Sequence, residues 1–162
     1  MIRDLTDEDW PGVWRFLREI VAAGETFPYD PRMSETEARA MWVVAPPGRT
    51  VVAVADDGAV AGTANMYANR PGGGSHIASG SLMVDPRRSG RGVGRALTEE
   101  MITWARAQGF RGIQFNAVVE GNERAERLYL SLGFEIAGTV PEAFRHPAKG
   151  YVGLQVMYRP LT

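Results

Sequence analysis

The sequence predicts an α/β domain built on one mixed β-sheet, with elements in the order β-α-α-β-β-β-α-β-α-β-β. Apolar residues recur at helical spacing in several separate segments, and valine-rich runs typical of strands stand between those segments. The 162 residues contain no repeat, low-complexity tract or linker. We therefore expect one domain over residues 1–162, with about seven strands and about four helices.

Two helices are expected early in the chain. The apolar side chains of the first recur every three or four residues, at Trp10, Val13, Trp14, Leu17, Ile20 and Val21. Thr6 or Asp7 can cap its start. Ser34 and Glu37 have the spacing of a capping box, which predicts a second helix through about Val44.

Three strands should follow these helices. Residues 50–55 are rich in valine, the Asp-Asp-Gly sequence at 56–58 predicts a turn, and residues 60–69 are expected to return as the second strand of a hairpin. After a glycine-rich loop, a third strand is expected over residues 76–84, and the Asp-Pro pair at 85–86 ends it.

The second half of the chain predicts two more helices and three more strands. Glycines lead into a helix whose apolar face is formed by Val93, Leu97, Met101 and Trp104. A strand is expected over residues 113–119, and Asn122 can cap the next helix. The apolar face of that helix holds Ala125, Leu128, Tyr129 and Leu132. The last strands are expected over residues 134–140 and 151–158.

Composition and charge exclude several classes of function. Without cysteine the chain has no disulfide or cysteine nucleophile, and two separated histidines do not suggest a metal site. A net charge of −1 without a basic stripe argues against a nucleic-acid partner. No apolar run is long enough to span a membrane, and the start of the chain lacks the features of a signal peptide. We therefore expect a cytoplasmic protein with no membrane partner.

A glycine-rich turn, Ser-Gly-Arg-Gly-Val-Gly-Arg at residues 89–95, follows a predicted strand and opens a predicted helix. The first N–H groups of a helix have no partner within it, the helix dipole adds positive charge there, and glycine lets a ligand approach the backbone. Arginines at 88, 91 and 95 can add charge. The turn is a candidate cradle for phosphate or pyrophosphate, although a connection without a ligand could have the same pattern.

Two common phosphate-binding patterns do not fit this turn. The Walker pattern ends in Gly-Lys-Ser/Thr, which is absent. The dinucleotide-binding pattern would need a glycine where Arg95 stands, within a repeated βαβ unit. The ligand therefore has to be inferred from motifs outside the turn.

Further motifs accompany the glycine turn in a fixed order. They are Leu-Met-Val-Asp-Pro at 82–86, Gly-Arg-Gly-Val-Gly-Arg-Ala-Leu at 90–97, Asn-Glu-Arg-Ala at 122–125, Leu-Tyr at 128–129 and Leu-Gly-Phe at 132–134. Together with the order of elements along the whole chain, they resemble the GNAT superfamily of acetyltransferases. The family turn is written Gln/Arg-x-x-Gly-x-Gly/Ala; aligned on Gly92 and Gly94, its first position is Ser89, a departure, and Arg88 lies one place early.

The resemblance implies a GNAT fold in which two central parallel strands, residues 76–84 and 113–119, splay apart. It implies that acetyl-CoA, the cosubstrate, lies in the resulting V with its pyrophosphate on the glycine turn and its pantetheine arm beside β-strand residues 82–84. The N–H of Leu82 would polarise the thioester carbonyl. The implied cofactor-binding residues are Leu82, Met83, Val84, Ser89, Gly90, Arg91, Gly92, Val93, Gly94, Arg95, Asn122 and Tyr129.

Two of these residues also have simpler interpretations. Tyr129 resembles the general acid of the family, which donates a proton to the departing CoA thiolate, but it could also be a core tyrosine. Asn122 resembles the asparagine that bonds to the pantetheine arm, and it could equally be a helix N-cap. The two roles of Asn122 are compatible.

Acetylation of an amine also needs a base or a desolvating site, because free alkyl amines are mostly protonated at neutral pH. The candidate bases are His76, at the start of the predicted cofactor strand, and Glu120, just beyond the next strand. Glu25 and His146 are further candidates.

The C-terminal half resembles a narrower group, the bacterial relatives of fungal acetyltransferases that modify proline analogues such as azetidine-2-carboxylate. In that group asparagines on the two splayed strands face the acceptor; Asn116 matches one, and Ser79 stands at the other position as a departure. Asn116 could instead be a buried strand asparagine. The aromatic residues expected to wall the acceptor pocket, or to form an ordinary core rim, are Phe27, Tyr29, Phe144 and Tyr151.

The expected activity is transfer of an acetyl group from acetyl-CoA to a small-molecule amine, by direct attack in a ternary complex and without a metal. The alternatives are acetylation of protein N-termini or lysines, and a sensor that binds acyl-CoA without turnover. A homodimer is expected only by analogy with the family.

Overall fold

The computed structural model describes all of residues 1–162. Its strands are β1 (Ile2–Asp4), β2 (Arg49–Val54), β3 (Val60–Ala68), β4 (Ile77–Val84), β5 (Gly112–Val119), β6 (Glu135–His146) and β7 (Gly150–Pro160). They form one seven-stranded sheet in the order β1-β2-β3-β4-β5-β7-β6. Only β4 and β5 are parallel; the other neighbours are antiparallel.

Four α-helices accompany the sheet, in the order that the sequence predicts. They are α1 (Trp10–Ala23), α2 (Glu35–Trp42), α3 (Val93–Ala107) and α4 (Glu123–Ser131), and the short 3₁₀ turns are η1 (Asp7–Asp9), η2 (Gly72–Gly74) and η3 (Pro86–Arg88). The mixed α/β class and the number of elements are therefore confirmed. No helix is long and apolar enough to cross a membrane.

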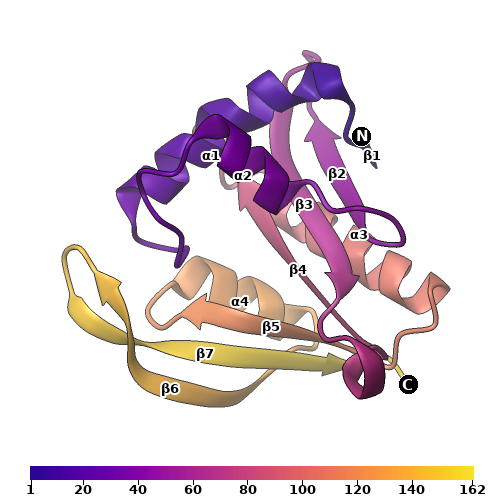
Figure 1. The fold of residues 1–162 in the computed structure, drawn as a ribbon, viewed down its shortest axis with the longest axis vertical. Helices are drawn as coiled ribbons and strands as arrows, with labels where there is room; N and C mark the ends of the chain where they lie inside the picture. The colour runs from indigo at the N-terminus through magenta and orange to yellow at the C-terminus, as the bar shows by residue number, and fades with distance from the viewer.

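The helices cover both faces of the sheet (Figure 1). On one face α1 and α2 enclose a buried cluster that includes Phe16, Leu17 and Trp42. On the other face α3 and α4 enclose a larger cluster that includes Met101 and Phe134. Burial of these apolar stripes against the sheet is what stabilises helices of this length.

The sheet splays at its centre. The pairing of β4 with β5 is limited to Ile77 with Gly112 and Ala78 with Ile113, and the two strands diverge beyond this point (Figure 1). A register shift between Phe115 and Val118 marks a bulge in β5 against β7, and such bulges bend a strand. The predicted splay of the two central strands is thus present.

The β6–β7 hairpin is longer than the sequence analysis predicts. The strand was expected to end at residue 140, before Pro141, but β6 runs on to His146. Proline is tolerated on an edge strand, where its missing N–H removes no ladder bond, and a register shift between Val140 and Phe144 accommodates it. The hairpin projects from the body of the molecule (Figure 1).

Candidate active site

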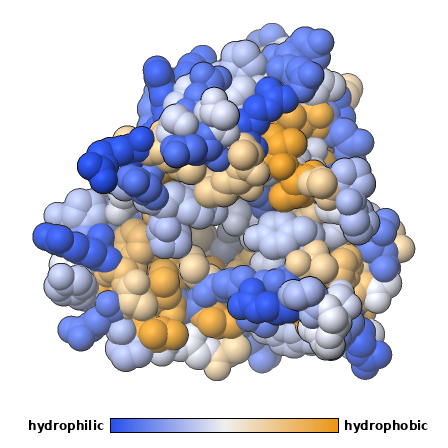
Figure 2. Space-filling view, viewed as in Figure 1, coloured by the Kyte–Doolittle hydropathy of each residue, from blue (hydrophilic) through white to orange (hydrophobic).

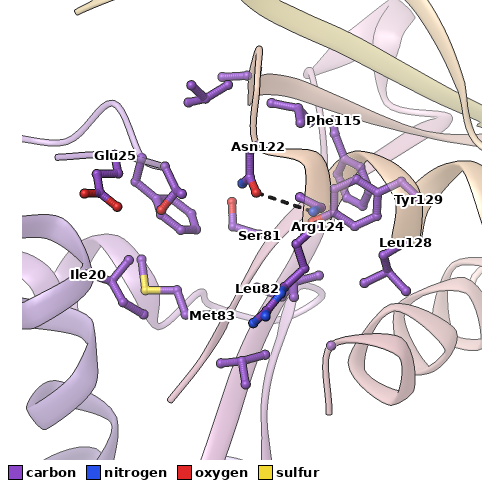
Figure 3. A pocket seen from close by; sticks show the side chains of 18 of the residues that line it. Ile20, Glu25, Ser81, Leu82, Met83, Phe115, Asn122, Arg124, Leu128 and Tyr129 are labelled. Atoms are coloured by element: carbon purple, nitrogen blue, oxygen red, sulfur yellow. Dashed lines mark hydrogen bonds between the residues drawn. The ribbon is translucent and has the colours of Figure 1, made fainter. Parts of the chain in front are cut away.

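A cleft of about 910 Å³ opens where β4 and β5 diverge. It is lined by the loop after α1, the outer part of β4, the start of α3, β5 and the first turns of α4. Figure 2 shows the corresponding hollow at the centre of this face, between the half that carries α1 and α2 and the half that carries β6 and β7. In the close view of Figure 3, Ser81 on β4 and Asn122 at the start of α4 lie across the cleft from each other.

The glycine turn forms one end of the cleft. The first N–H group of α3 that donates a hydrogen bond is that of Ala96, which donates to the Gly92 carbonyl at 3.0 Å. The N–H groups of residues 90 to 95 have no acceptor in the protein. Gly90 and Gly92 have φ of +77° and +79°, values that L side chains rarely adopt, and a Cβ at either would point into open space. These amides therefore form an open anion cradle at the N-terminus of a long helix.

The charges around the cradle differ from expectation. Arg88 forms an ion pair with Asp57 at 2.6 Å and does not line the main cleft. Arg95 lines the main cleft, and its guanidinium donates to the Ser131 hydroxyl at 2.7 Å. Arg91 lines a neighbouring groove of about 450 Å³ and not the main cleft. Arg124 lines the main cleft and forms no ion pair, and Figure 3 shows its side chain reaching toward Leu82. The sequence analysis missed Arg124, although it lies within the Asn-Glu-Arg-Ala motif.

The turn before the cradle is anchored by Asp85, whose side chain is fully buried. Burial opposes ionisation of this carboxyl, but hydrogen bonds from Arg87 and the charges of Arg87 and Arg15 outweigh it and lower its pKa. Arg15 on α1 contacts Asp85 at 3.0 Å, and Arg87 contacts Glu19 at 2.7 Å. These ion pairs connect α1 to the base of the glycine turn.

The edge of β4 forms the floor of the cleft. Asn69 donates its N–H to the Ile77 carbonyl at 2.8 Å, and Asp85 donates to the Ala61 carbonyl at 2.9 Å. Antiparallel ladders alternate between residues that bond to the neighbouring strand and residues that do not, so the odd-numbered residues of β4 face β3. The N–H and C=O groups of residues 80, 82 and 84 consequently face the opposite edge, which β5 has left.

Tyr129 lies in an aromatic group at the α4 side of the cleft. Its ring centroid is 4.6 Å from that of Phe115 and 5.7 Å from that of Phe134. The residue lines the cleft but is only 9% exposed, and burial raises the pKa of its hydroxyl well above the ordinary value. The neighbouring Asn122 caps α4 by accepting a hydrogen bond from the Ala125 N–H at 3.4 Å.

The other end of the cleft has an aromatic wall. Phe27 and Tyr29, from the loop between α1 and α2, stack with centroids 5.4 Å apart and line the cleft. Burial raises the pKa of Tyr29, although a hydrogen bond with Ser81 opposes this shift. Ser79 and Tyr67 also line this end; the sequence analysis identified Ser79 and missed Tyr67 and Ser81.

Side-chain amides gather beside this wall. Asn116 on β5 exchanges two hydrogen bonds with Asn69, at 2.7 and 3.3 Å, and accepts a third from Gln114 at 3.0 Å. Asn116 lines the cleft and is exposed. It is therefore not the buried strand asparagine of the alternative interpretation.

Besides Arg91, four predicted site residues lie outside the cleft. His76 precedes β4 at the end where β4 and β5 still pair, away from the splay. The Glu120 carboxylate faces β7, where it accepts from the Gly153 N–H at 3.4 Å. Phe144 and Tyr151 were expected to wall the acceptor pocket or to form a core rim, but they lie on the β6–β7 hairpin away from the cleft, with Phe144 buried and Tyr151 66% exposed. None of the four lines the cleft.

The two further candidate bases, Glu25 and His146, lie in different parts of the structure. Glu25 lines the cleft from the loop after α1, and Figure 3 places its carboxylate beside the cavity. His146 is held in the hairpin turn, where its Nδ1 accepts from the N–H groups of Ala148 and Lys149 at 3.0 and 3.1 Å. Of the four candidate bases, only Glu25 reaches the site.

Comparisons with known sequences agree with this geometry. The profile of the Acetyltransferase (GNAT) family matches residues 13–134. N-acetyltransferase aca1 of Schizosaccharomyces pombe is 30% identical over 152 residues, which cover 85% of this chain and 72% of the relative. Mycothiol acetyltransferase of Geodermatophilus obscurus is 36% identical over 152 residues, covering 88% of this chain but only 47% of the relative.

Solved structures show the same fold. A GCN5-related N-acetyltransferase from Kribbella flavida superimposes with a TM-score of 0.96 at 58% identity, covering 99% of this chain and 96% of that one. A phosphinothricin acetyltransferase from Sinorhizobium meliloti, in complex with AcCoA, superimposes with a TM-score of 0.89 at 25% identity, covering 99% and 87%. The chain therefore belongs to the GNAT family and is an N-acetyltransferase.

Proposed function

We propose that this enzyme transfers the acetyl group of acetyl-CoA to the amine of a small molecule of the amino-acid or proline-analogue class. The main observation behind this proposal is one continuous cleft with two different ends. One end is the anion cradle at the start of α3, and the other, between β4, β5 and the loop after α1, is lined by aromatic and amide side chains. The bare edge of β4 runs between the two ends.

The residues present fit the cosubstrate. The unpaired amides of residues 90 to 95 suit a pyrophosphate, because they present several N–H groups and a helix dipole to one anion. The outward N–H and C=O groups of residues 82 and 84 suit the amide groups of a pantetheine arm. Acetyl-CoA supplies an acetyl group activated as a thioester.

Four residues would take part in the acetyl transfer. The Leu82 N–H would donate to the thioester oxygen, where negative charge develops. As the carbon–nitrogen bond forms and the carbon–sulfur bond breaks, the Tyr129 hydroxyl would give its proton to the sulfur. The acceptor nitrogen loses one proton, for which Glu25 is the base we favour, directly or through water. Asn122 would bond to the pantetheine arm while it caps α4.

Support for a small acceptor comes from the dimensions and lining of the cleft end. Phe27 and Tyr29 close it on one side, and the Asn116–Asn69 pair supplies amide groups that can bind a carboxylate or an amine. Two similar proteins are named for small acceptors, mycothiol and phosphinothricin. Ser79 occupies the position where the proline-analogue group has a second asparagine, so Asn116, held by its two hydrogen bonds with Asn69, would contact the acceptor.

A panel assay tests the proposal. Thiol release from acetyl-CoA would be measured with amino acids, proline analogues, polyamines and aminoglycosides, and with peptides as the competing acceptor class. Turnover with amino acids or azetidine-2-carboxylate is the expected result. Turnover with peptides alone would replace the small-molecule proposal by protein acetylation, and binding of acetyl-CoA without turnover on any acceptor would favour a sensor.

We also propose that the enzyme forms a homodimer through β6. This strand is the outer edge of the sheet, and its first nine residues are all exposed. Ile136 and Val140 are 40% and 56% exposed on it. Long exposed edge strands with apolar side chains are normally covered by another element. The same strand of a second copy can cover this edge by pairing with it about a two-fold axis.

A further inference from the structure

Asn65 on β3 is a buried polar residue next to the cleft whose side chain bonds to two other elements. It is 4% exposed. Its Oδ1 accepts from the Ser81 N–H on β4 at 2.9 Å, and its Nδ2 donates to the Trp42 carbonyl at the end of α2 at 3.0 Å. Both ends of the amide are therefore held, and the bond to β4 has a defined direction.

The contact with β4 falls next to the group that the proposed chemistry needs. Ser81 directly precedes Leu82, and the N–H groups of neighbouring strand residues point to opposite edges. A bond that draws the Ser81 N–H toward β3 consequently turns the Leu82 N–H toward the cleft. On the cleft side no strand holds the Leu82 N–H, because β5 pairs with β4 only at Ile77 and Ala78; its direction is set from the β3 side, where Asn65 lies opposite Ser81.

Gly80 shows how closely β3 and β4 approach at this point. A Cβ on Gly80 would collide with the backbone oxygen of Asn65 and with the Met101 side chain. The backbone of β4 is thus confined between β3 and α3 immediately before Ser81. Asn65 acts on this segment with both its main chain and its side chain.

We propose that Asn65 is a positioning residue, which holds β4 so that the Leu82 N–H is aimed at the thioester oxygen. The inference rests on the proposed function, because it assumes that this N–H polarises the carbonyl. Asn65 itself does not line the cleft and touches no substrate.

Asn65→Leu tests the inference, since leucine has a similar volume but makes neither hydrogen bond. Thr63→Val is the matched control on the same strand. Thr63 is fully buried, and its hydroxyl accepts from Trp42 Nε1 at 3.0 Å and donates to the Val51 carbonyl at 2.8 Å, so neither of these side-chain hydrogen bonds involves β4. Both variants should lower the melting temperature, because each leaves a buried polar group without its partner.

Measurement of kcat distinguishes a positioning role of Asn65 from a role in stability alone. Loss of one oxyanion donor costs about 10²–10³ in kcat, so misdirecting it in Asn65→Leu should lower kcat by roughly 10-fold to 100-fold. The affinity for acetyl-CoA should change by less than about 3-fold, because the phosphate cradle is intact. Thr63→Val should keep the wild-type kcat at a temperature where it is folded. Equal kcat in Asn65→Leu and Thr63→Val would overturn the inference.

A spectroscopic measurement distinguishes failure of this inference from failure of the proposed function. The carbonyl stretch of acetyl-CoA labelled with ¹³C at the thioester would be recorded by infrared difference spectroscopy, bound to the enzyme without acceptor. We expect a shift to lower frequency in the wild type and in Thr63→Val, and a smaller shift in Asn65→Leu. No shift in the wild type would overturn the polarisation by Leu82, whereas equal shifts in all three proteins would overturn only the role of Asn65.

Discussion

Tyr129 occupies a position that suits a proton donor. Its ring packs on Phe115 while the residue still lines the cleft, and the raised pKa keeps its proton on the hydroxyl throughout the physiological range. An acid with this property is still protonated at the higher pH at which most of an amine acceptor has lost its proton. Burial therefore gives Tyr129 both the environment of a core residue and the raised pKa that suits a proton donor.

Tyr129→Phe should lower kcat by about 10²-fold, because proton donation to the leaving thiolate is lost while packing is retained. Affinity for acetyl-CoA, measured by calorimetry, should hardly change. Because the pKa of Tyr129 is raised, the wild-type kcat/KM should rise with pH as the acceptor loses its proton and should not fall again below about pH 10. An unchanged kcat in the variant would remove Tyr129 as the acid.

Arg124 gives a second prediction for a single residue. It lines the cleft without an ion pair, so we expect its guanidinium to contact a phosphate of CoA. Arg124→Ala should raise the KM for acetyl-CoA by about 5-fold to 10-fold, equivalent to ~1 kcal/mol, and should leave the KM for acetyl-pantetheine, which has no phosphate, unchanged.

The matched control for Arg124 is Arg127→Ala, one turn further along α4. Arg127 pairs with Glu123 at 3.1 Å and does not line the cleft. It should leave both KM values at the wild-type level. An equal rise for the two acetyl donors in Arg124→Ala would show that the arginine contacts something other than phosphate.

At the scale of elements, the start of α3 carries the anion cradle. Gly92→Ala should weaken acetyl-CoA binding by about 10-fold or more, because its Cβ would enter the space that a phosphate needs and because φ of +79° is strained for alanine. Gly109→Ala is the control for strain alone, since Gly109 has φ of +81° and open space around it at the other end of α3. Calorimetric titration measures both variants; similar acetyl-CoA affinities for the two would argue against the cradle.

The beginning of α1 provides a pH-dependent test. Asp9 accepts bonds from Arg3 at 2.6 and 2.9 Å and from the Thr6 N–H at 2.8 Å. The Arg3 hydrogen bond, more than any other cause, lowers the pKa of Asp9 from 3.8 to about 2. A carboxyl with a depressed folded-state pKa stabilises the protein above about pH 4, and this stabilisation is lost as the pH falls toward 2.

Asp9→Asn should therefore melt below the wild type at pH 6 and close to it at pH 2. Loss of such a capping interaction costs about 1 kcal/mol, which corresponds to about 2–4 °C in a chain of this size. Differential scanning calorimetry across this pH range checks the prediction, with Asp56→Asn, at an exposed turn position, as the control for net charge. A difference that persists at pH 2 would contradict it.

At the scale of the whole molecule, the splay divides the sheet into two halves that are joined in the sheet by two residue pairs of β4 and β5. The half with β1 to β4 carries α1 and α2 on one face, and the half with β5 to β7 ends in the exposed edge of β6. In the proposed mechanism, one half supplies the anion cradle and the polarising edge of β4, and both halves meet at Tyr129 and the acceptor end. Catalysis by this mechanism would depend on the relative placement of segments from the entire chain.

The exposed edge predicts the oligomeric state. Light scattering coupled to size-exclusion chromatography should give a mass about twice the 17.7 kDa of one chain. Val140→Lys should yield the single-chain mass, since a charge on the edge strand disfavours pairing. A wild-type mass of one chain at micromolar concentration would contradict the dimer.

Much of this protein is determined by local sequence patterns. Helical spacing of apolar residues, the Ser34–Glu37 capping box and the glycine turn encode their elements within a few residues, because caps, turns and amphipathic periods are local interactions. The motifs around Gly92 and Asn122 likewise identified the family, and they predict which end of the cleft binds the cofactor.

Only the tertiary structure decided the acceptor end. Phe144 and Tyr151 were expected to wall the pocket but lie on the long β6–β7 hairpin outside it, whereas Glu25 and Tyr67 line the cleft from elements far apart in sequence. The role of Asn65 depends on a register between β3 and β4 and on the end of α2. These contacts between distant residues arise from long-range strand pairing and packing, which no local spacing encodes. Local sequence patterns therefore determine the helices and strands, whereas the tertiary fold determines which side chains share the site.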